Sequence, residues 1–275
     1  PKGVLALNQN PKVFESPDST VRLGAGRNMV NSMRYWLRAS QMIEPDSYQL
    51  TDLGMILLHA KTGYDPFLED EATIWLLHWL IASNSSLATS FFWFFNKFHQ
   101  AEFSSQELTT ALGDFLQDEI PEHRRPAQNT VKSDAAVLPR MYTQTKITQR
   151  MPLEEALDSP FALLNLIEHK EHARSFVSVQ APRPSLPSGI LGFAVVSFML
   201  AKGVQIIPVE DLMYSKDDYC APGSVFRITE NDFLTKLEQL VSAVPDKLEI
   251  RESSSIHQLY SLAELDPFLL LKNHY

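Results

Sequence analysis

The stretch from Leu23 to Leu58, LGAGRNMVNSMRYWLRASQMIEPDSYQLTDLGMILL, decides how the N-terminal part of this chain folds. Gly24 and Gly26 indicate a tight turn, and a helix is predicted to begin directly after it. Apolar residues recur along this helix at the spacing of a single helical face: Met29, Met33, Trp36 and Leu37. We expect this face to anchor the helix in the protein body.

A second stripe runs along the same helix at a different angle. It consists of polar and cationic residues three or four positions apart: Arg27, Asn31, Arg34 and Arg38. Arginine and asparagine can pair bidentately with guanine and adenine edges, so the stripe is typical of a major-groove recognition helix. The periodicity fits a solvated surface helix equally well, but the glycine turn before the helix and the segment after it favour nucleic-acid contact. Arg22 and Asn28 complete this part of the predicted DNA-binding set.

The segment after the helix predicts a wing. Residues 44–47, Glu-Pro-Asp-Ser, indicate a turn, and residues 48–50 are typical of a short strand. Thr51 and Asp52 then favour the start of another helix. Residues 1–63 are therefore predicted to form a winged helix-turn-helix domain.

Residues 64–150 are predicted to form a central helical domain. The apolar segment 72–99 predicts two helices interrupted near Asn84, and its aromatic residues are expected to form the main core. His78 lies among these aromatic residues, so we predict a buried histidine with satisfied hydrogen bonds rather than a metal ligand. Ser104 and Glu107 have the spacing of a capping box at the start of a further helix.

Three acidic residues, Asp65, Glu69 and Asp70, precede the apolar segment. Asp70 is placed to cap the helix that follows, and acids favour a helix N-terminus. The alternative is that the three carboxylates bind a divalent metal, Mg²⁺ or Mn²⁺, and act catalytically in phosphodiester cleavage. Their spacing matches no established metal motif, so the sequence leaves both interpretations open.

Basic residues gather again between positions 119 and 150. Arg124 and Arg125 lie in a predicted exposed loop, and a helix is predicted to follow. The remaining basic residues of this segment are Lys132, Arg140, Lys146 and Arg150. The group either contacts DNA phosphates or forms an ordinary solvated surface, and the pattern does not distinguish the two.

Residues 151–275 predict an α+β domain that resembles a second winged-helix unit. Helices are expected over 153–157, 160–172, 190–200, 230–241 and 255–261 and from Pro267, and strands over 174–180, 204–208, 222–228 and 248–251. This part carries little positive charge, so we expect it to bind proteins or act as a scaffold. The whole chain is thus predicted to be mainly α-helical with short β-hairpins.

Charge is distributed unevenly along the 275 residues, which carry a formal net charge of −9. Residues 1–63 and 119–150 have net charges of +2 and +3, whereas residues 64–118 and 151–275 each have −7. This distribution predicts local nucleic-acid binding through few phosphate contacts. The single cysteine, Cys220, excludes an internal disulfide and fits a reducing cytoplasm. The longest apolar run, residues 190–201, is too short to span a membrane.

Several segments together resemble one bacterial domain family found in defence islands beside sulfur-transfer genes for DNA phosphorothioation. They are GAGRNMVNSMRYWL (24–37), YQLTDLG (48–54), YDPFLEDEATIWLLHW (64–79), FFWFFNKF (91–98) and DPFLLLKNHY (266–275). The resemblance implies a protein that nicks one DNA strand so that sulfur can replace a non-bridging phosphate oxygen. It also implies partners: DNA, a cysteine desulfurase, a sulfur-transferring pyrophosphatase-like enzyme and an ATPase. It identifies no catalytic residue, and a non-catalytic DNA-binding adaptor or specificity subunit is the alternative. A transcriptional regulator ranks last, because no long heptad pattern indicates a dimerisation helix.

Overall fold

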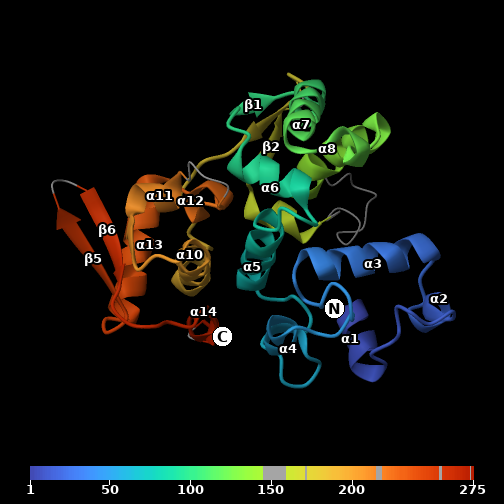
Figure 1. The fold of residues 1–275 in the computed structure, drawn as a ribbon, viewed down its shortest axis with the longest axis horizontal. Coiled ribbons are helices and arrows are strands. Elements are labelled where there is room, and N and C mark those ends of the chain that lie inside the picture. The colour runs from blue at the N-terminus through green and yellow to red at the C-terminus, as the bar shows by residue number, and fades with distance from the viewer. Residues whose placement is uncertain (145–158, 171, 215–218, 254–255, 273) are drawn as a thin grey trace.

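The computed structural model describes residues 1–144, 159–170, 172–214, 219–253, 256–272 and 274–275 (Figure 1). The described chain is mainly helical and contains two small antiparallel sheets. The helix predicted over 153–157 and the basic residues Lys146 and Arg150 lie outside the described residues.

The N-terminal region contains α1 (Lys2–Gln9), α2 (Ser19–Arg22), α3 (Arg27–Ala39) and α4 (Asp52–Leu58). Gly24 has a φ of +51° in the tight turn between α2 and α3, a conformation that glycine adopts without steric cost. The hydroxyl of Thr51 accepts a hydrogen bond of 3.0 Å from the amide of Gly54 and so caps α4, as predicted. The helix predicted from the opening stretch is therefore confirmed.

The predicted wing differs from a regular two-stranded hairpin. In the described structure it consists of a turn closed by one isolated antiparallel bridge between Ile43 and Leu50. Tyr48 has a φ of +55°, which interrupts the extended backbone that the predicted strand would need. The winged-helix layout of this region stays a prediction.

The central region supplies most of the buried aromatic residues of the described core. It contains α5 (Glu71–Ala82), α6 (Thr89–Asn96), β1 (Glu102–Phe103), α7 (Ser105–Glu119), the 3₁₀ helix η1 (Glu122–Arg124) and α8 (Gln128–Tyr142). Every residue from Ala72 to Ala82 is buried, because α5 is enclosed by other elements on all sides. The two predicted aromatic-rich helices and the capping box of Ser104 and Glu107 are confirmed.

His78, on α5, is fully buried with both ring nitrogens hydrogen-bonded. Nε2 lies 2.9 Å from the carbonyl oxygen of Val225, and Nδ1 lies 2.7 Å from the hydroxyl of Tyr142. A carbonyl only accepts, so Nε2 carries the proton and Nδ1 accepts from the tyrosine. Burial lowers the pKa of His78 to about 3. The predicted satisfied core histidine is confirmed, and it links α5 to α8 and to residue 225.

The C-terminal region alternates helices and strands. It contains η2 (Pro160–Leu164), β2 (Ile167–Lys170), β3 (Ser175–Ser178), α10 (Ser188–Lys202), β4 (Ile206–Pro208), α11 (Val209–Met213), α12 (Pro222–Val225), α13 (Glu230–Ala243), β5 (Leu248–Ser253), β6 (Ile256–Ser261) and α14 (Pro267–Lys272). One sheet has the order β1-β3-β2 and the other the order β4-β6-β5, with antiparallel neighbours. Because β1 pairs with β3, the first sheet joins segments on both sides of residue 150.

Three predicted elements of this region are wrong. The helix expected over 160–172 stops after η2, because Asn165 adopts a left-handed conformation and the following residues pair as β2. The strand expected over 222–228 is the short helix α12, which has Pro222 at its first position. The helix expected over 255–261 is β6, the central strand of its sheet.

Among the described residues, none of the helices combines the length and the apolar character that a bilayer-spanning segment needs. The last residues of the chain pack beside the segment between α4 and α5 (Figure 1). The ring of Tyr275 stacks on Tyr64 at 4.9 Å between centroids, and its hydroxyl lies 2.7 Å from that of Thr73. The C-terminal region is thereby held against the start of α5, next to the acidic cluster.

Candidate nucleic-acid interface

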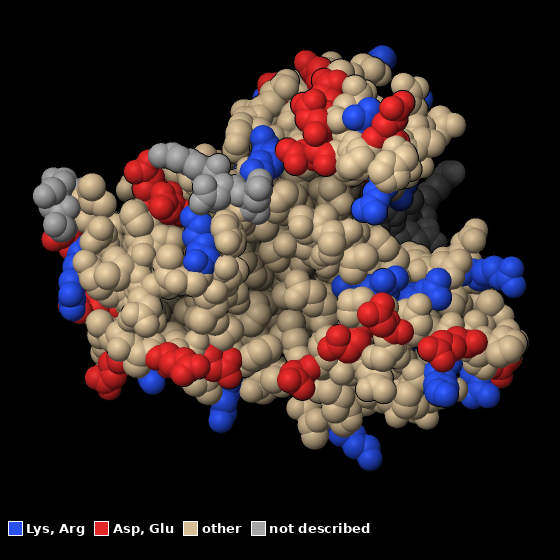
Figure 2. Space-filling model, viewed as in Figure 1, with Lys and Arg blue, Asp and Glu red and all other residues tan. Residues whose placement is uncertain are grey.

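Helix α3 presents its polar and cationic stripe on an open face of the molecule. Arg27, Asn28 and Asn31 are exposed, and Arg34 and Arg38 are half-buried. None of these arginines pairs with a carboxylate within the described part of the chain. Figure 2 shows Lys and Arg side chains gathered in a row over α3. At 1.5 Å per residue, the stripe from residue 27 to residue 38 is about 16 Å long.

The turn after α3 supports the stripe from one side. The guanidinium of Arg34 lies 5.7 Å from the ring centroid of Tyr48, and its Nη2 is 3.5 Å from Oδ1 of Asn31. Such a cation–π contact restrains the arginine without neutralising it. Tyr48 was not predicted as part of the site, because an aromatic residue in a turn carries no local signal that it will reach a neighbouring helix.

The face that anchors α3 differs from the predicted one. Val30 is buried in a small N-terminal core with Leu23, whereas the side chain of Met29 is 59% exposed. Trp36 is only half-buried and meets the ring of Phe91 edge-on at 5.7 Å between centroids. The predicted apolar face therefore anchors the helix only in part, and its remaining side chains are half-buried or exposed.

Arg22, beside the stripe, already has a partner. Its Nε donates a hydrogen bond of 2.8 Å to Oδ2 of Asp18 one helical turn away. Hydrogen bonds from Ser16 and from this arginine lower the pKa of Asp18. Both members of the pair are exposed, and surface ion pairs of this kind are weak, so the pair can open when a phosphate approaches.

The second basic group is divided between different environments. Arg124, Lys132 and Arg140 are exposed, and Arg140 lies at a groove beside α3. Arg125 instead donates hydrogen bonds to two carbonyl oxygens at the end of α7, at 2.8 Å from Nε to Ile120 and 2.7 Å from Nη2 to residue 117. This arginine caps carbonyl groups that the helix leaves unsatisfied. Phosphate contact by these four cations stays a prediction.

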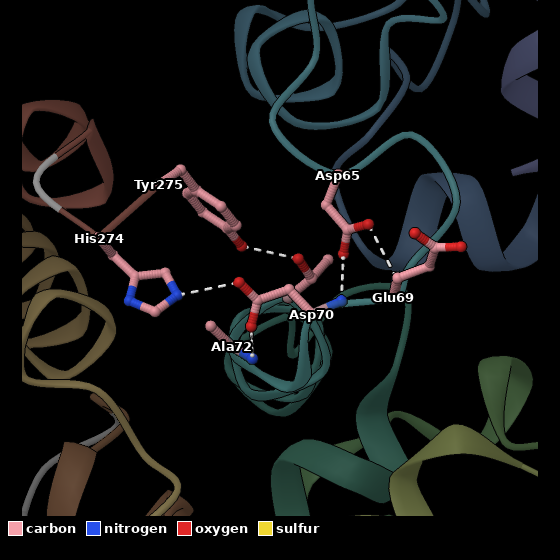
Figure 3. A network of polar contacts seen from close by, with 7 residues as sticks. Asp65, Glu69, Asp70, Ala72, His274 and Tyr275 are labelled. Carbon is pink, nitrogen blue, oxygen red and sulfur yellow. Dashed lines mark hydrogen bonds and ion pairs between the residues drawn. The ribbon is translucent and has the colours of Figure 1, made fainter.

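The three acidic residues near the start of α5 play different structural parts (Figure 3). Asp65 is buried, and its two oxygens accept hydrogen bonds from the amides of Glu69 and Asp70 at 2.8 and 3.1 Å. Asp70 caps α5 by accepting from the amide of Ala72 at 2.8 Å, and its other oxygen lies 3.2 Å from Nε2 of His274. Glu69 is exposed, and its carboxylate points away from the other two.

These contacts do not fit a divalent metal. Mg²⁺ needs several oxygen ligands that converge on one point, whereas both oxygens of Asp65 and of Asp70 already accept or face hydrogen-bond donors. Within the described ranges, no group of three or more His, Cys, Asp or Glu side chains could hold a metal ion. The predicted cap at Asp70 is confirmed, and a catalytic role for Asp65, Glu69 and Asp70 stays a prediction.

Comparison with known proteins places these features in a family. Residues 1–275 match the family described as "Protein of unknown function (DUF4007)". A crystal structure of SspB matches with a TM-score of 0.84 and 27% identity, covering 100% of this chain and 83% of that one. A crystal structure of magnesium ion-bound SspB matches with a TM-score of 0.86 and the same identity and coverage. No curated protein matches the chain. The similarity to SspB agrees with the family resemblance found in the sequence.

Proposed function

This chain belongs to the DUF4007 family, and from that premise we propose that it binds DNA through α3 in a phosphorothioation system and nicks one strand for sulfur incorporation. The open stripe from Arg27 to Arg38 carries the DNA-binding part of the proposal. The nicking part follows from the family resemblance in the sequence, and the similarity to SspB over the whole chain supports a place in a phosphorothioation system. The expected partners are the cysteine desulfurase, the pyrophosphatase-like enzyme and the ATPase that the family resemblance implies.

The dimensions of the stripe suit a short stretch of duplex. Its length of about 16 Å corresponds to roughly five base pairs at 3.4 Å per pair, and the major groove, about 12 Å wide, accepts one helix. Arg27 is exposed and can reach base edges or phosphates, whereas Arg34 is held against Tyr48 and donates a long hydrogen bond to Asn31. Because few cations are involved, we expect local binding with a modest dependence on salt.

Strand cleavage needs an attacking water, stabilisation of the charge that develops on the phosphate, and a protonated leaving group. Asp65, Glu69 and Asp70 do not fit a metal site, so we derive no step through a metal held by them. A Mg²⁺ or Mn²⁺ requirement is proposed only from the similarity to magnesium ion-bound SspB. Assays with and without divalent cation therefore form part of the test.

A non-catalytic adaptor or specificity subunit is the second candidate. The observation that favours it is the engagement of Asp65 and Asp70 in hydrogen bonds that stabilise the start of α5. In this alternative α3 still binds DNA, while another subunit of the modification complex cuts the strand. The two candidates differ in one result, cleavage by the isolated protein.

Nicking of a supercoiled plasmid, measured with Mg²⁺, Mn²⁺ or EDTA, separates the candidates. A nickase converts the plasmid to open circles, and the adaptor binds DNA without cleavage under every condition. The variant R27A/N31A/R34A is expected to lose DNA affinity by at least about 30-fold, since each base-contacting arginine contributes at least about 1 kcal/mol. Its melting temperature should change little, because Arg27 and Asn31 are exposed and the half-buried Arg34 loses only a surface cation–π contact with Tyr48. The control K12A/K61A also removes two exposed cations and should bind normally.

If the isolated protein nicks, alanine variants at the three acidic residues test the catalytic prediction. Activity that survives the combined substitution of Asp65, Glu69 and Asp70 excludes them from catalysis and leaves the nicking proposal intact. A loss of activity counts for the prediction only if DNA binding and the folded circular dichroism spectrum are retained.

A further inference from the structure

Asn31 and Arg34 stand about one helical turn apart on α3 and contact each other. Nη2 of Arg34 lies 3.5 Å from Oδ1 of Asn31, a long hydrogen bond between two side chains at the surface. Arginine carries only hydrogen-bond donors, so the amide of Asn31 turns its oxygen toward Arg34. The Nδ2 group of Asn31, which carries only donors, therefore points away from the arginine.

Tyr48 restrains the guanidinium of Arg34. The ring centroid lies 5.7 Å from Cζ of the arginine, within the range of a cation–π contact. The turn that carries Tyr48 is closed by backbone hydrogen bonds from Glu44 to residues 48 and 49, at 3.2 and 2.8 Å. The ring also packs against the small N-terminal core, so its position is fixed by the protein body. An arginine restrained before binding loses less conformational freedom when it binds.

The other members of the stripe add no acceptor. Arg27 and Arg38, which lie before and after the pair along α3, carry donors alone. Within the described part of the chain, none of the arginines of the stripe forms an ion pair with a carboxylate. The only side-chain acceptor of the stripe is thus the oxygen of Asn31, and Arg34 already engages it.

Bases in the major groove differ in what they offer to a row of donors. Guanine presents two neighbouring acceptors, N7 and O6, and arginine can donate to both. Adenine presents the acceptor N7 beside the donor N6, and cytosine presents the donor N4. Asparagine pairs bidentately with adenine only when its oxygen accepts from N6, and at Asn31 that oxygen faces Arg34.

We propose that Asn31 and Arg34 act as one unit that presents only donors, so that α3 selects guanine over adenine at the base pair it contacts. The guanidinium of Arg34 donates to N7 and O6 of this guanine, and Nδ2 of Asn31 donates to a neighbouring acceptor. The charge of Arg34 then lies between the two phosphate backbones and still displaces counterions. Tyr48 is a positioning residue, since it acts through Arg34. The inference rests on the proposed DNA binding by α3 and does not depend on nicking.

Enrichment from a randomised duplex library tests this preference, with the whole protein kept in EDTA. Guanine is expected at one position of the enriched site, and adenine there should weaken binding at least about fivefold in competition assays. 7-Deazaguanine lacks the N7 acceptor and should weaken binding by a similar factor. Inosine keeps both N7 and O6 and should bind as guanine does.

Variants assign the preference to particular side chains. R34A should bind the guanine and 7-deazaguanine duplexes equally, because the group that reads N7 is gone. N31A should lower the ratio of affinities for guanine and adenine. Y48A should also lower this ratio, whereas Y48F keeps the ring and should retain it. K12A/K61A removes two exposed cations outside the stripe and should retain it as well.

The proposal is overturned if the enriched site shows no guanine preference, or if R34A or N31A leaves that preference unchanged. Enrichment of adenine that is lost in N31A would also overturn it, because the amide oxygen would then accept from N6. Each of these results leaves DNA binding by α3 standing. A wild-type ratio in Y48A would overturn the role given to Tyr48. If the protein binds no duplex of the library, the proposed DNA binding itself fails, and the base preference with it.

Discussion

Replacing His78 with glutamine should remove a defined part of the pH dependence of stability. The imidazole is fully buried, and its two nitrogens already have partners in Val225 and Tyr142, so a second proton has no acceptor. Burial accordingly lowers the pKa of His78 from 6.5 to about 3. Glutamine cannot titrate in this range, so it keeps a polar side chain in place while abolishing the linkage between folding and protonation.

The size of the effect follows from the two pKa values. Below pH 6.5 the unfolded chain binds a proton at this histidine, while the native protein stays neutral at it until about pH 3. The stability that His78 contributes is therefore fully present above pH 6.5 and is lost as the pH falls toward 3. Between pH 7 and pH 5 the loss amounts to about 2 kcal/mol. Because pH 5 lies well above the native pKa of about 3, this loss of unfolding free energy depends little on the exact pKa of His78 in the native protein.

Urea unfolding at pH 7 and pH 5 measures the effect. The drop in unfolding free energy between the two conditions should be about 2 kcal/mol larger for the wild type than for H78Q, whatever the stability of the variant at pH 7. His123→Gln replaces an exposed histidine and should keep the wild-type drop. Equal drops for wild type and H78Q would refute the reasoning, since they would show that the buried ring is protonated as readily as in the unfolded chain.

Three further substitutions test the fold around the site. Ser104→Ala removes the cap of α7 and should cost about 1 kcal/mol in urea unfolding, whereas no change would show that the capping box is dispensable. Trp36→Ala should lower the unfolding free energy by less than about 3 kcal/mol, the lower limit for a fully buried aromatic residue, because Trp36 is half-buried. A larger loss would mean that Trp36 is fully buried in solution. Asp65→Ala leaves two amides without an acceptor and should cost about 1–3 kcal/mol by calorimetry, and an unchanged melting temperature would contradict the structural role given to this carboxylate.

Features set by neighbours in the sequence could be predicted. Thr51, Ser104 and Asp70 each cap a helix that begins at the next residue, so a few residues contain the whole signal. The aromatic core could be predicted equally well, because two helices with apolar residues on all sides must be buried. The stripe from Arg27 to Arg38 follows in the same way from helical periodicity alone.

Features set by distant parts of the chain could not be predicted. The segment 256–261 is a strand because it pairs with β4 and β5, and such pairing depends on chain far from it in sequence. Met29 has the periodicity of a buried residue, yet it is exposed, and Val30 enters the small N-terminal core instead. The sequence predicts Arg125 as a basic residue of an exposed loop, and nothing near it in sequence indicates that it donates hydrogen bonds to the carbonyl groups at the end of α7. The contact of Tyr48 with Arg34 likewise depends on how a turn folds back on α3.

Contact between the arginines of α3 and DNA is tested most directly by the salt dependence of duplex affinity for the wild type and R27A/R34A. Each phosphate contact contributes about 0.9 to the slope of log affinity against log salt. If both arginines contact phosphates, the slope should fall by about 2 in the variant, with weaker binding at every salt concentration. K12A/K61A should keep the wild-type slope. An unchanged slope and affinity in R27A/R34A, or an equal loss in K12A/K61A, would contradict the assignment of α3 as the DNA-binding element.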